Sequence, residues 1–219
     1  MWQWCRWGLT VLLGIALPAM AGMLSNTSVP VSTAITAHYG TAGLDRVQRW
    51  QALMTRLRGQ PVMAQLAGVN DFFNQLDFVD DVDVWHQKDY WATPIEFMGV
   101  GRGDCEDFAL AKYLTLLELG VPDDQMRLHY VKYVPYDQFH MVLSWAAAPQ
   151  QMPVILDNID RNIALAASRR DLIPIYSFNG SSLWTSTASG HEAPVGSSSH
   201  LSRWENWQVR VRNGVMQSP

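Results

Sequence analysis

The stretch GRGDCEDFALAKYLTLLELG, residues 101–120, decides the fold. Asp104 is a residue type that caps helix starts, and Gly120 is a type at which helices commonly end. The apolar residues between them predict a helix from Cys105 to Leu119. Cys105 therefore lies in the first turn, where the helix dipole favours a thiolate. Three acidic residues crowd it in the sequence: Asp104, Glu106 and Asp107.

These acids pose a question, because nearby negative charge disfavours the thiolate form of a cysteine. Acids in a first helical turn are often only caps and partners of the helix dipole. Cys105 is then either an unreactive, small hydrophobic residue, or a reactive thiol beside which something cancels the negative charge.

Length and composition suit one domain with a hydrophobic core, or one domain plus a tail. The chain has 219 residues, of which 48% are hydrophobic and 16% are charged. The net charge is −4 and no basic run is present, so a nucleic-acid partner is not expected.

The N-terminus has the features of a secretory signal peptide over residues 1–21. Arg6 precedes the apolar run WGLTVLLGIAL (7–17), and Ala19-Met20-Ala21 offers a cleavage site. An uncleaved anchor is the alternative, and both place the folded part outside the cytoplasm. Cys5 falls within the signal, so Cys105 is the single cysteine of the mature chain and has no disulfide partner.

The remaining chain reads as helices followed by strands, which predicts an α+β fold. Residues 22–40, rich in Ser and Thr, are expected to form an extended lead-in to a domain at 41–215. Apolar spacing predicts helices at 43–58 and 62–76, then an acidic loop at 77–83 and an irregular aromatic segment at 84–103. Strands are predicted at 127–134, 139–145, 153–158, 172–180 and 204–212. Residues 180–200 are expected to form a flexible loop, either a flap or a spacer.

Two of these strands suggest a catalytic arrangement. A hairpin of 139–145 and 153–158, centred near residues 148 and 149, places His140 opposite Asp157. A helix start against this sheet brings Cys105 to His140, which gives nucleophile, base and orienting acid. His129 on the neighbouring strand competes for the role of base, and each residue also has a purely structural interpretation.

Four segments together resemble the bacterial transglutaminase-like cysteine peptidases, which include the periplasmic LapG-type proteases. They are DYWATPIEFMGVGRGDCEDFALAKYLTLLELG (89–120), YVKYVPYDQFHMVLSW (130–145), LDN (156–158) and DLIPIYSFN (171–179). The resemblance extends from about Val69 to Trp207. It implies a papain-like fold of the transglutaminase-like branch, in which N-terminal helices precede an antiparallel sheet. It also implies a triad of Cys105, His140 and Asp157.

The same resemblance implies a calcium ion bound beside the nucleophile. The acids that flank the cysteine map to Asp104 and Glu106, with Asp107 as a further candidate. Calcium takes about 6–8 oxygen ligands and would neutralise these carboxylates, which answers the question that the acids pose.

The resemblance further implies a biological role in the periplasm. The substrate would be the N-terminal region of a large outer-membrane adhesin, whose cleavage disperses a biofilm. The regulator would be an inner-membrane receptor for cyclic-di-GMP that sequesters the protease. Gln138-Phe139 before the histidine departs from the family pattern, in which a smaller residue is expected at 139.

Two other functions fit the same residues. A transglutaminase uses the same thiol chemistry with an amine in place of water. A calcium-dependent binding module with an inert thiol would not be an enzyme.

Overall fold

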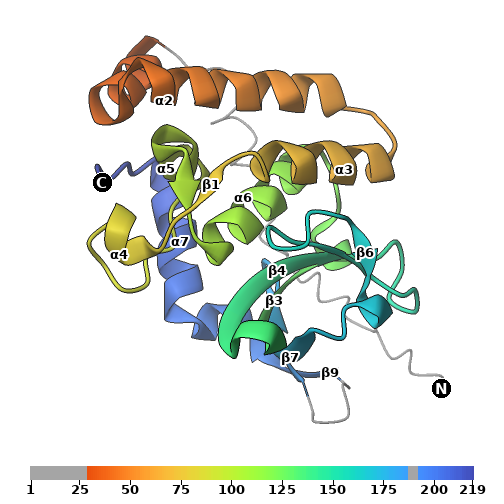
Figure 1. Cartoon of the computed structure of the whole chain (residues 1–219). Coiled ribbons are helices and arrows are strands. Elements are labelled where there is room, and N and C mark those ends of the chain that lie inside the picture. The colour runs from red at the N-terminus through yellow and green to blue at the C-terminus, as the bar shows by residue number, and fades with distance from the viewer. Residues whose placement is uncertain (1–28, 187–191) are drawn as a thin grey trace, which may run out of the picture.

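A seven-stranded antiparallel sheet forms one layer of the protein, and α-helices pack against it (Figure 1). The structure, a computed structural model, describes residues 29–186 and 192–219. The strands, in order across the sheet, are β6 (Ala164–Leu165), β5 (Val154–Leu156), β4 (Gln138–Trp145), β3 (Met126–Tyr133), β7 (Leu172–Phe178), β8 (Ser182–Ser186) and β9 (Glu192–Ser197). The predicted α+β class, with helices before the sheet, is confirmed.

The inner strand β4 is buried on both faces, as its unbroken apolar run Met141-Val142-Leu143 requires. On one face, Met141 and Leu143 join the main core, which includes helix α6 (Cys105–Glu118). On the other, Val142 forms a smaller cluster with Val131 and Ile155. This double burial fixes β4 between the helical layer and the outer loops, and it carries His140 into the interior.

The N-terminal helices form the second layer (Figure 1). They are α2 (Val29–Leu57), α3 (Val62–Phe73), α4 (Asp81–Val84) and α5 (Pro94–Val100). Helices α3 and α6 lie where the apolar spacing predicts them. Helix α5 lies within the segment predicted to be irregular, and its start is marked by a capping box in which Thr93 and Glu96 bond reciprocally. Among the residues that the structure describes, no helix is long and apolar enough to cross a membrane.

The extended conformation expected for residues 22–40 is wrong from Val29 onward, where α2 begins. Its hydroxyl groups are compatible with a helix because they bond within it, as Thr36 does to the carbonyl of Ser32 at 2.8 Å. Ile35 is fully buried, so tertiary packing stabilises the helix. Gly40, with φ 69°, kinks it. Residues 1–28, with the predicted signal peptide, lie outside the described residues, and the boundaries of the domain stay a prediction.

The predicted strand at 204–212 is also wrong, because helix α7 (Ser202–Asn213) occupies this segment. Trp204 and Trp207 are three residues apart, so they share one face of the helix, and both are 1% exposed. Val209 is exposed, which shows that the alternation of apolar residues here was misleading. The predicted loop at 180–200 instead contains β8 and β9, with residues 187–191 outside the described part of the chain.

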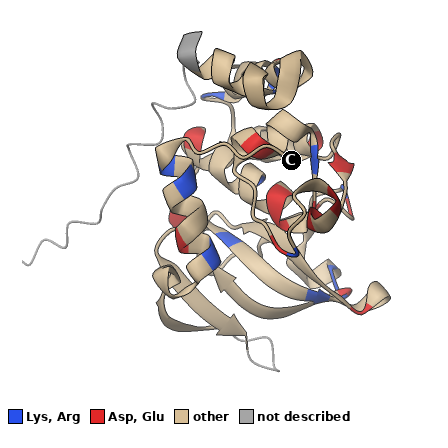
Figure 2. Ribbon diagram, turned by 90° about the vertical axis from the view of Figure 1, so that its left-hand side faces the viewer, with Lys and Arg blue, Asp and Glu red and all other residues tan. Residues whose placement is uncertain are grey.

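Helix α7 is tied to α5 and to the segment that precedes it. The Trp207 indole N–H donates to the Ala92 carbonyl at 2.9 Å, and Arg210 Nη1 bonds the buried Glu96 carboxylate at 3.0 Å. Figure 2 shows α7 with its charged residues beside the sheet. These contacts join the last helix to the segment leading to Cys105.

Candidate active site

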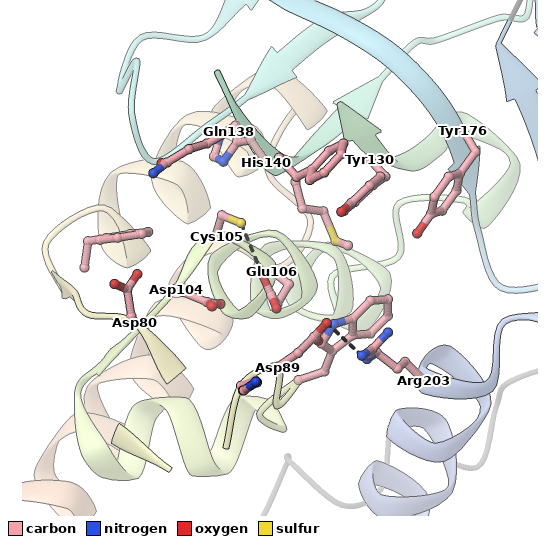
Figure 3. Close-up of a pocket in the computed structure, with 15 residues that line it drawn as sticks. Asp80, Asp89, Asp104, Cys105, Glu106, Tyr130, Gln138, His140, Tyr176 and Arg203 are labelled. Atoms are coloured by element: carbon pink, nitrogen blue, oxygen red, sulfur yellow. Dashed lines mark hydrogen bonds and ion pairs between the residues drawn. The ribbon is translucent and has the colours of Figure 1, made fainter. Parts of the chain in front are cut away.

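Cys105 is the first residue of α6, as predicted, and Asp104 occupies the N-cap position without a side-chain capping bond. Helix α6 packs against β4, and the Cys105 sulfur accepts a hydrogen bond from the backbone N–H of Met141. Figure 3 shows the sulfur directed toward β4, where His140 lies. The start of α6 thus brings the thiol next to the residue that follows His140.

His140 and Asp157 form a buried pair. His140 Nε2 lies 2.8 Å from Asp157 Oδ1, and the two residues are 3% and 1% exposed. The predicted register was wrong by two residues, because Leu143 pairs with Leu156 and the ladder would place Asp157 opposite Val142. A slip of two residues keeps Asp157 on the same face of the sheet, so it reaches His140 diagonally. His129 bonds Ser144 at 2.8 Å and does not line this site.

Asp157 is held as a carboxylate. Burial by itself raises the pKa of Asp157, but hydrogen bonds from His140, from the Ile159 N–H and from Arg169 outweigh it and hold the pKa well below its usual range. With Nε2 of His140 bonded to Asp157, Nδ1 is the imidazole nitrogen left for a proton exchange with a thiol.

The acids beside Cys105 have the opposite electrostatics. Burial, followed by the charges of neighbouring carboxylates, raises the pKa of Asp104 to about 11 and that of Asp107 well above its ordinary value. Burial likewise raises the pKa of Asp81, to about 7. Carboxylate oxygens of Asp81, Asp104 and Asp107 lie within 4.8 Å of one another.

Each of these three aspartates also has one buried oxygen without a hydrogen-bond partner: Asp81 Oδ1, Asp104 Oδ1 and Asp107 Oδ2. Buried polar atoms in folded proteins are normally satisfied, so three unpartnered oxygens in one place suit a bound cation. The adjoining backbone leaves no room for a side chain at Gly103, where a Cβ would lie 2.2 Å from Asp107 Oδ2.

The thiol responds to the same charges. Burial raises the pKa of Cys105 well above its ordinary value, and the charges of Glu106 and Asp104 raise it further. The thiol donates to Glu106 Oε2 at 3.1 Å. Without a cation, the acids therefore disfavour the thiolate, as the sequence suggested.

A pocket of about 460 Å³ opens over Cys105 and His140. One wall is aromatic: Tyr130 stacks on Phe139 at 5.2 Å and on Tyr176 at 5.0 Å between ring centroids. Across the pocket, Asp89 pairs with Arg203 at 2.9 Å (Figure 3). Trp91 lines the pocket but is 8% exposed and stacks on Phe178, so it belongs to both the core and the wall.

Two residues that the sequence left unassigned belong to these groups. Asp81 lies in the predicted acidic loop, and the parallel pairing of β1 (Asp77–Phe78) with β2 (Arg102–Gly103) carries this loop to the start of α6. Arg169 contacts Asp157 and gave no local signal. The acidic composition of the loop is the signal that points to Asp81.

A model of the family of bacterial transglutaminase-like cysteine proteinases (BTLCP) matches residues 45–191. The chain belongs to this family. The match includes the Cys105 helix, the His140 strand and Asp157. No curated protein sequence matches the chain.

Solved structures of this family share the fold. Legionella pneumophila LapG, EGTA-treated, is 38% identical over 84% of this chain and 98% of its own, with a TM-score of 0.73. Calcium-bound LapG from the same organism is 39% identical over 84% of this chain and 99% of its own, with a TM-score of 0.71. The predicted papain-like, transglutaminase-like fold and the family resemblance are therefore confirmed.

Proposed function

We propose that the protein is a calcium-dependent cysteine endopeptidase of the periplasm, and that it cleaves the N-terminal region of a large outer-membrane adhesin. The observation that carries the chemistry is the buried His140–Asp157 pair beside the Cys105 thiol, in a pocket open to a peptide chain. The family membership supports hydrolysis of a peptide bond, and the resemblance of the sequence to the LapG-type proteases motivates the adhesin substrate.

The reaction follows from the arrangement of the three side chains. His140 Nδ1 takes the proton of Cys105, and the thiolate attacks the scissile carbonyl carbon. The backbone N–H of Cys105, at the start of α6, is placed to donate to the oxyanion. His140 returns the proton to the leaving amine, and water then hydrolyses the thioester. Asp157 keeps the imidazole in the tautomer whose Nδ1 accepts protons.

A calcium ion fits the acid cluster, whose three unpartnered oxygens belong to Asp81, Asp104 and Asp107. Glu106 lies within the same reach of Asp104 and is a fourth candidate ligand. When bound, calcium supplies positive charge that neutralises these acids and favours the thiolate. Calcium-bound and EGTA-treated forms of LapG support the choice of metal.

The regulator is proposed to be an inner-membrane receptor that binds cyclic-di-GMP in the cytoplasm and sequesters the protease in the periplasm. Release of the protease would let it cut the adhesin and disperse a biofilm. This role is taken from the family resemblance of the sequence.

A gel-based cleavage assay tests the proposal. The purified protein is mixed with the N-terminal fragment of the largest secreted repeat adhesin of the host, with calcium or with EGTA. We expect one discrete cut that needs both calcium and Cys105, and no cut by Cys105→Ala with an unchanged far-UV CD spectrum. Cleavage by Cys105→Ala would refute the nucleophile. Amine-labelled products in place of fragments would identify a transglutaminase.

A further inference from the structure

Arg169 is the only basic side chain, among the described residues, that forms an ion pair with the carboxylate of Asp157 apart from His140. Its Nη2 lies 2.7 Å from Asp157 Oδ2, on the oxygen that His140 does not use. Arg169 is 7% exposed, which is unusual for an arginine without a specific partner. Its burial and its contact with Asp157 indicate a role within the site.

The guanidinium is itself fixed by a second acid. Arg169 Nε lies 3.0 Å from Asp171 Oδ1, and Nη2 lies 2.8 Å from Asp171 Oδ2, so Asp171 grips the planar group with both oxygens. The side chain of Asp171 is 30% exposed. The charged groups of Asp171, Arg169 and Asp157 therefore form a series from the surface to the buried imidazole. Arg169 thus reaches Asp157 with a set orientation.

The backbone of Asp157 is held from the other side. Its carbonyl accepts from Asn74 Nδ2 at 2.8 Å and from Lys112 Nζ at 3.0 Å. The carboxyl group is held through both of its oxygens. Oδ1 meets His140 Nε2 and the Ile159 N–H, and Oδ2 meets Arg169 Nη2, which is the cation beside it.

We propose that Arg169 is a positioning residue, which keeps the Asp157 carboxylate ionised and oriented so that His140 is held as the Nε2–H tautomer. This inference rests on the proposed function, because it assigns Arg169 a task within the proposed triad. An ionised Asp157 only accepts hydrogen bonds, so the proton must stay on His140 Nε2 and Nδ1 stays free to accept one. A protonated Asp157 can donate to Nε2, which moves the imidazole proton to Nδ1 and blocks the thiol from transferring its own.

Two readouts on Arg169→Met test the proposal, with Arg170→Met as the matched control because Arg170 is the exposed neighbour. For cleavage of the adhesin fragment, we expect kcat to fall about 100-fold with KM within about twofold, since the defect is one of orientation. In a Cys105→Ala background, ¹⁵N spectra of the His140 imidazole at pH 8 should show the neutral ring moving from the Nε2–H to the Nδ1–H tautomer. Arg170→Met should change neither readout.

Arg169→Lys keeps a cation and most of the buried volume, so it tests the proposal even if Arg169→Met does not fold. A single ammonium is not planar and cannot form the paired hydrogen bonds to Asp171 together with the bond to Asp157. We therefore expect kcat to lie between that of the wild type and that of Arg169→Met. An unchanged kcat and an unchanged tautomer in either folded Arg169 variant would overturn the proposal.

The tautomer readout needs no substrate, which separates this inference from the proposed function. A wild-type protein that cuts no adhesin would refute the proposed substrate, while a tautomer change in Arg169→Met would still support the role of Arg169. Cleavage of the adhesin by the wild type, with the same His140 tautomer in the wild type and in Arg169→Met, would support the proposed function and refute the role of Arg169.

Discussion

Two sets of charged side chains, an acid cluster and a carboxylate with its arginine, flank the Cys105 thiol and the His140 imidazole, and they are opposite in character. In the acid cluster of Asp81, Asp104 and Asp107, burial raises every pKa and each residue keeps an unpartnered oxygen. In the pair of Asp157 and Arg169, both carboxylate oxygens have partners and the pKa is lowered.

The difference shows that the partner, and not burial alone, decides the charge of a buried carboxyl group. The network around Asp157 supplies partners from the chain to both carboxylate oxygens, which suits a residue that must keep one orientation. The acid cluster lacks positive charge of its own, which suits a site completed by an ion.

The largest effect is expected from breaking the completed network with Asp157→Asn. The amide cannot hold His140 in the required tautomer as an ionised carboxylate does, and we expect kcat to fall by about 10²–10⁴-fold. It also leaves Arg169 without its inner charge partner, at about 3 kcal/mol of unfolding free energy. Enzyme kinetics and urea unfolding measure the two effects. Asp160, which is only partly buried and does not line the pocket, provides the control Asp160→Asn, and equal activity of the two variants would contradict the assignment.

Calcium binding at the proposed site should raise the free energy of unfolding, because the ion neutralises the mutual repulsion within the acid cluster. Calcium at 100 times its dissociation constant should add about 2.7 kcal/mol to the unfolding free energy. For a chain of this length, this corresponds to a rise of about 5–10 °C in melting temperature. EGTA should abolish both the rise and the cleavage activity.

Asp81→Asn should remove this calcium-dependent rise, because it deletes one of the three unpartnered carboxylates. Asp83→Asn, on the exposed side of the same short helix, should retain it. Thermal unfolding followed by CD with and without calcium makes the measurement. A full calcium response in Asp81→Asn would remove Asp81 from the site.

Lys112, beneath Asp157, tests the pH dependence of the completed network. Burial lowers the pKa of Lys112 to about 7, below the value near 10.4 in the unfolded chain. The unfolded state thus binds more protons between these two values, and stability should rise with pH there. Equivalently, the free energy of unfolding should fall as the pH is lowered toward the folded-state pKa of Lys112, about 7. The slope is expected to be about 1.4 kcal/mol per pH unit at most.

Urea unfolding between pH 7 and 9 measures this slope. Lys112→Met should remove it, whereas Lys88→Met, at an exposed position, should leave it as in the wild type. The same slope in Lys112→Met would show that another group titrates.

The smallest effect is expected at Phe139, in the aromatic wall beside the histidine. Its ring is 59% exposed and stacks on Tyr130, so it shapes the groove without supporting the core. Phe139→Ala should change the preference for residues beside the cut by about threefold to tenfold, with an unchanged melting temperature. Competing peptide substrates analysed by mass spectrometry provide the test. A lowered melting temperature would show instead that the ring supports the fold.

The sequence predicted the parts of the fold and site that depend on local patterns. The helix that begins at Cys105 has its N-cap and its glycine stop, and the strands that carry His140 and Leu156 have continuous apolar runs. The alternation of faces along a strand placed Asp157 beside His140 even though the register was wrong by two residues.

The parts that were not predicted depend on contacts between distant segments. Asp81 joins the acid cluster through the pairing of β1 with β2, and Arg169 reaches Asp157 from the position directly after the short 3-10 turn Ala166–Ser168. The alternating apolar residues of α7 favoured a strand, and only the packing of Trp204 and Trp207 decided for a helix. Local composition carries little information on such pairings.

The attachment of α7 also affects when the enzyme is complete. Arg203 closes one side of the pocket through Asp89, and Trp207 and Arg210 hold α5 and the segment before it. This helix follows every strand of the sheet in the chain, so a growing polypeptide has no finished groove until its final helix has been made. A molecule that lacks α7 is therefore expected to lack this side of the groove and the support of the segment that leads to Cys105.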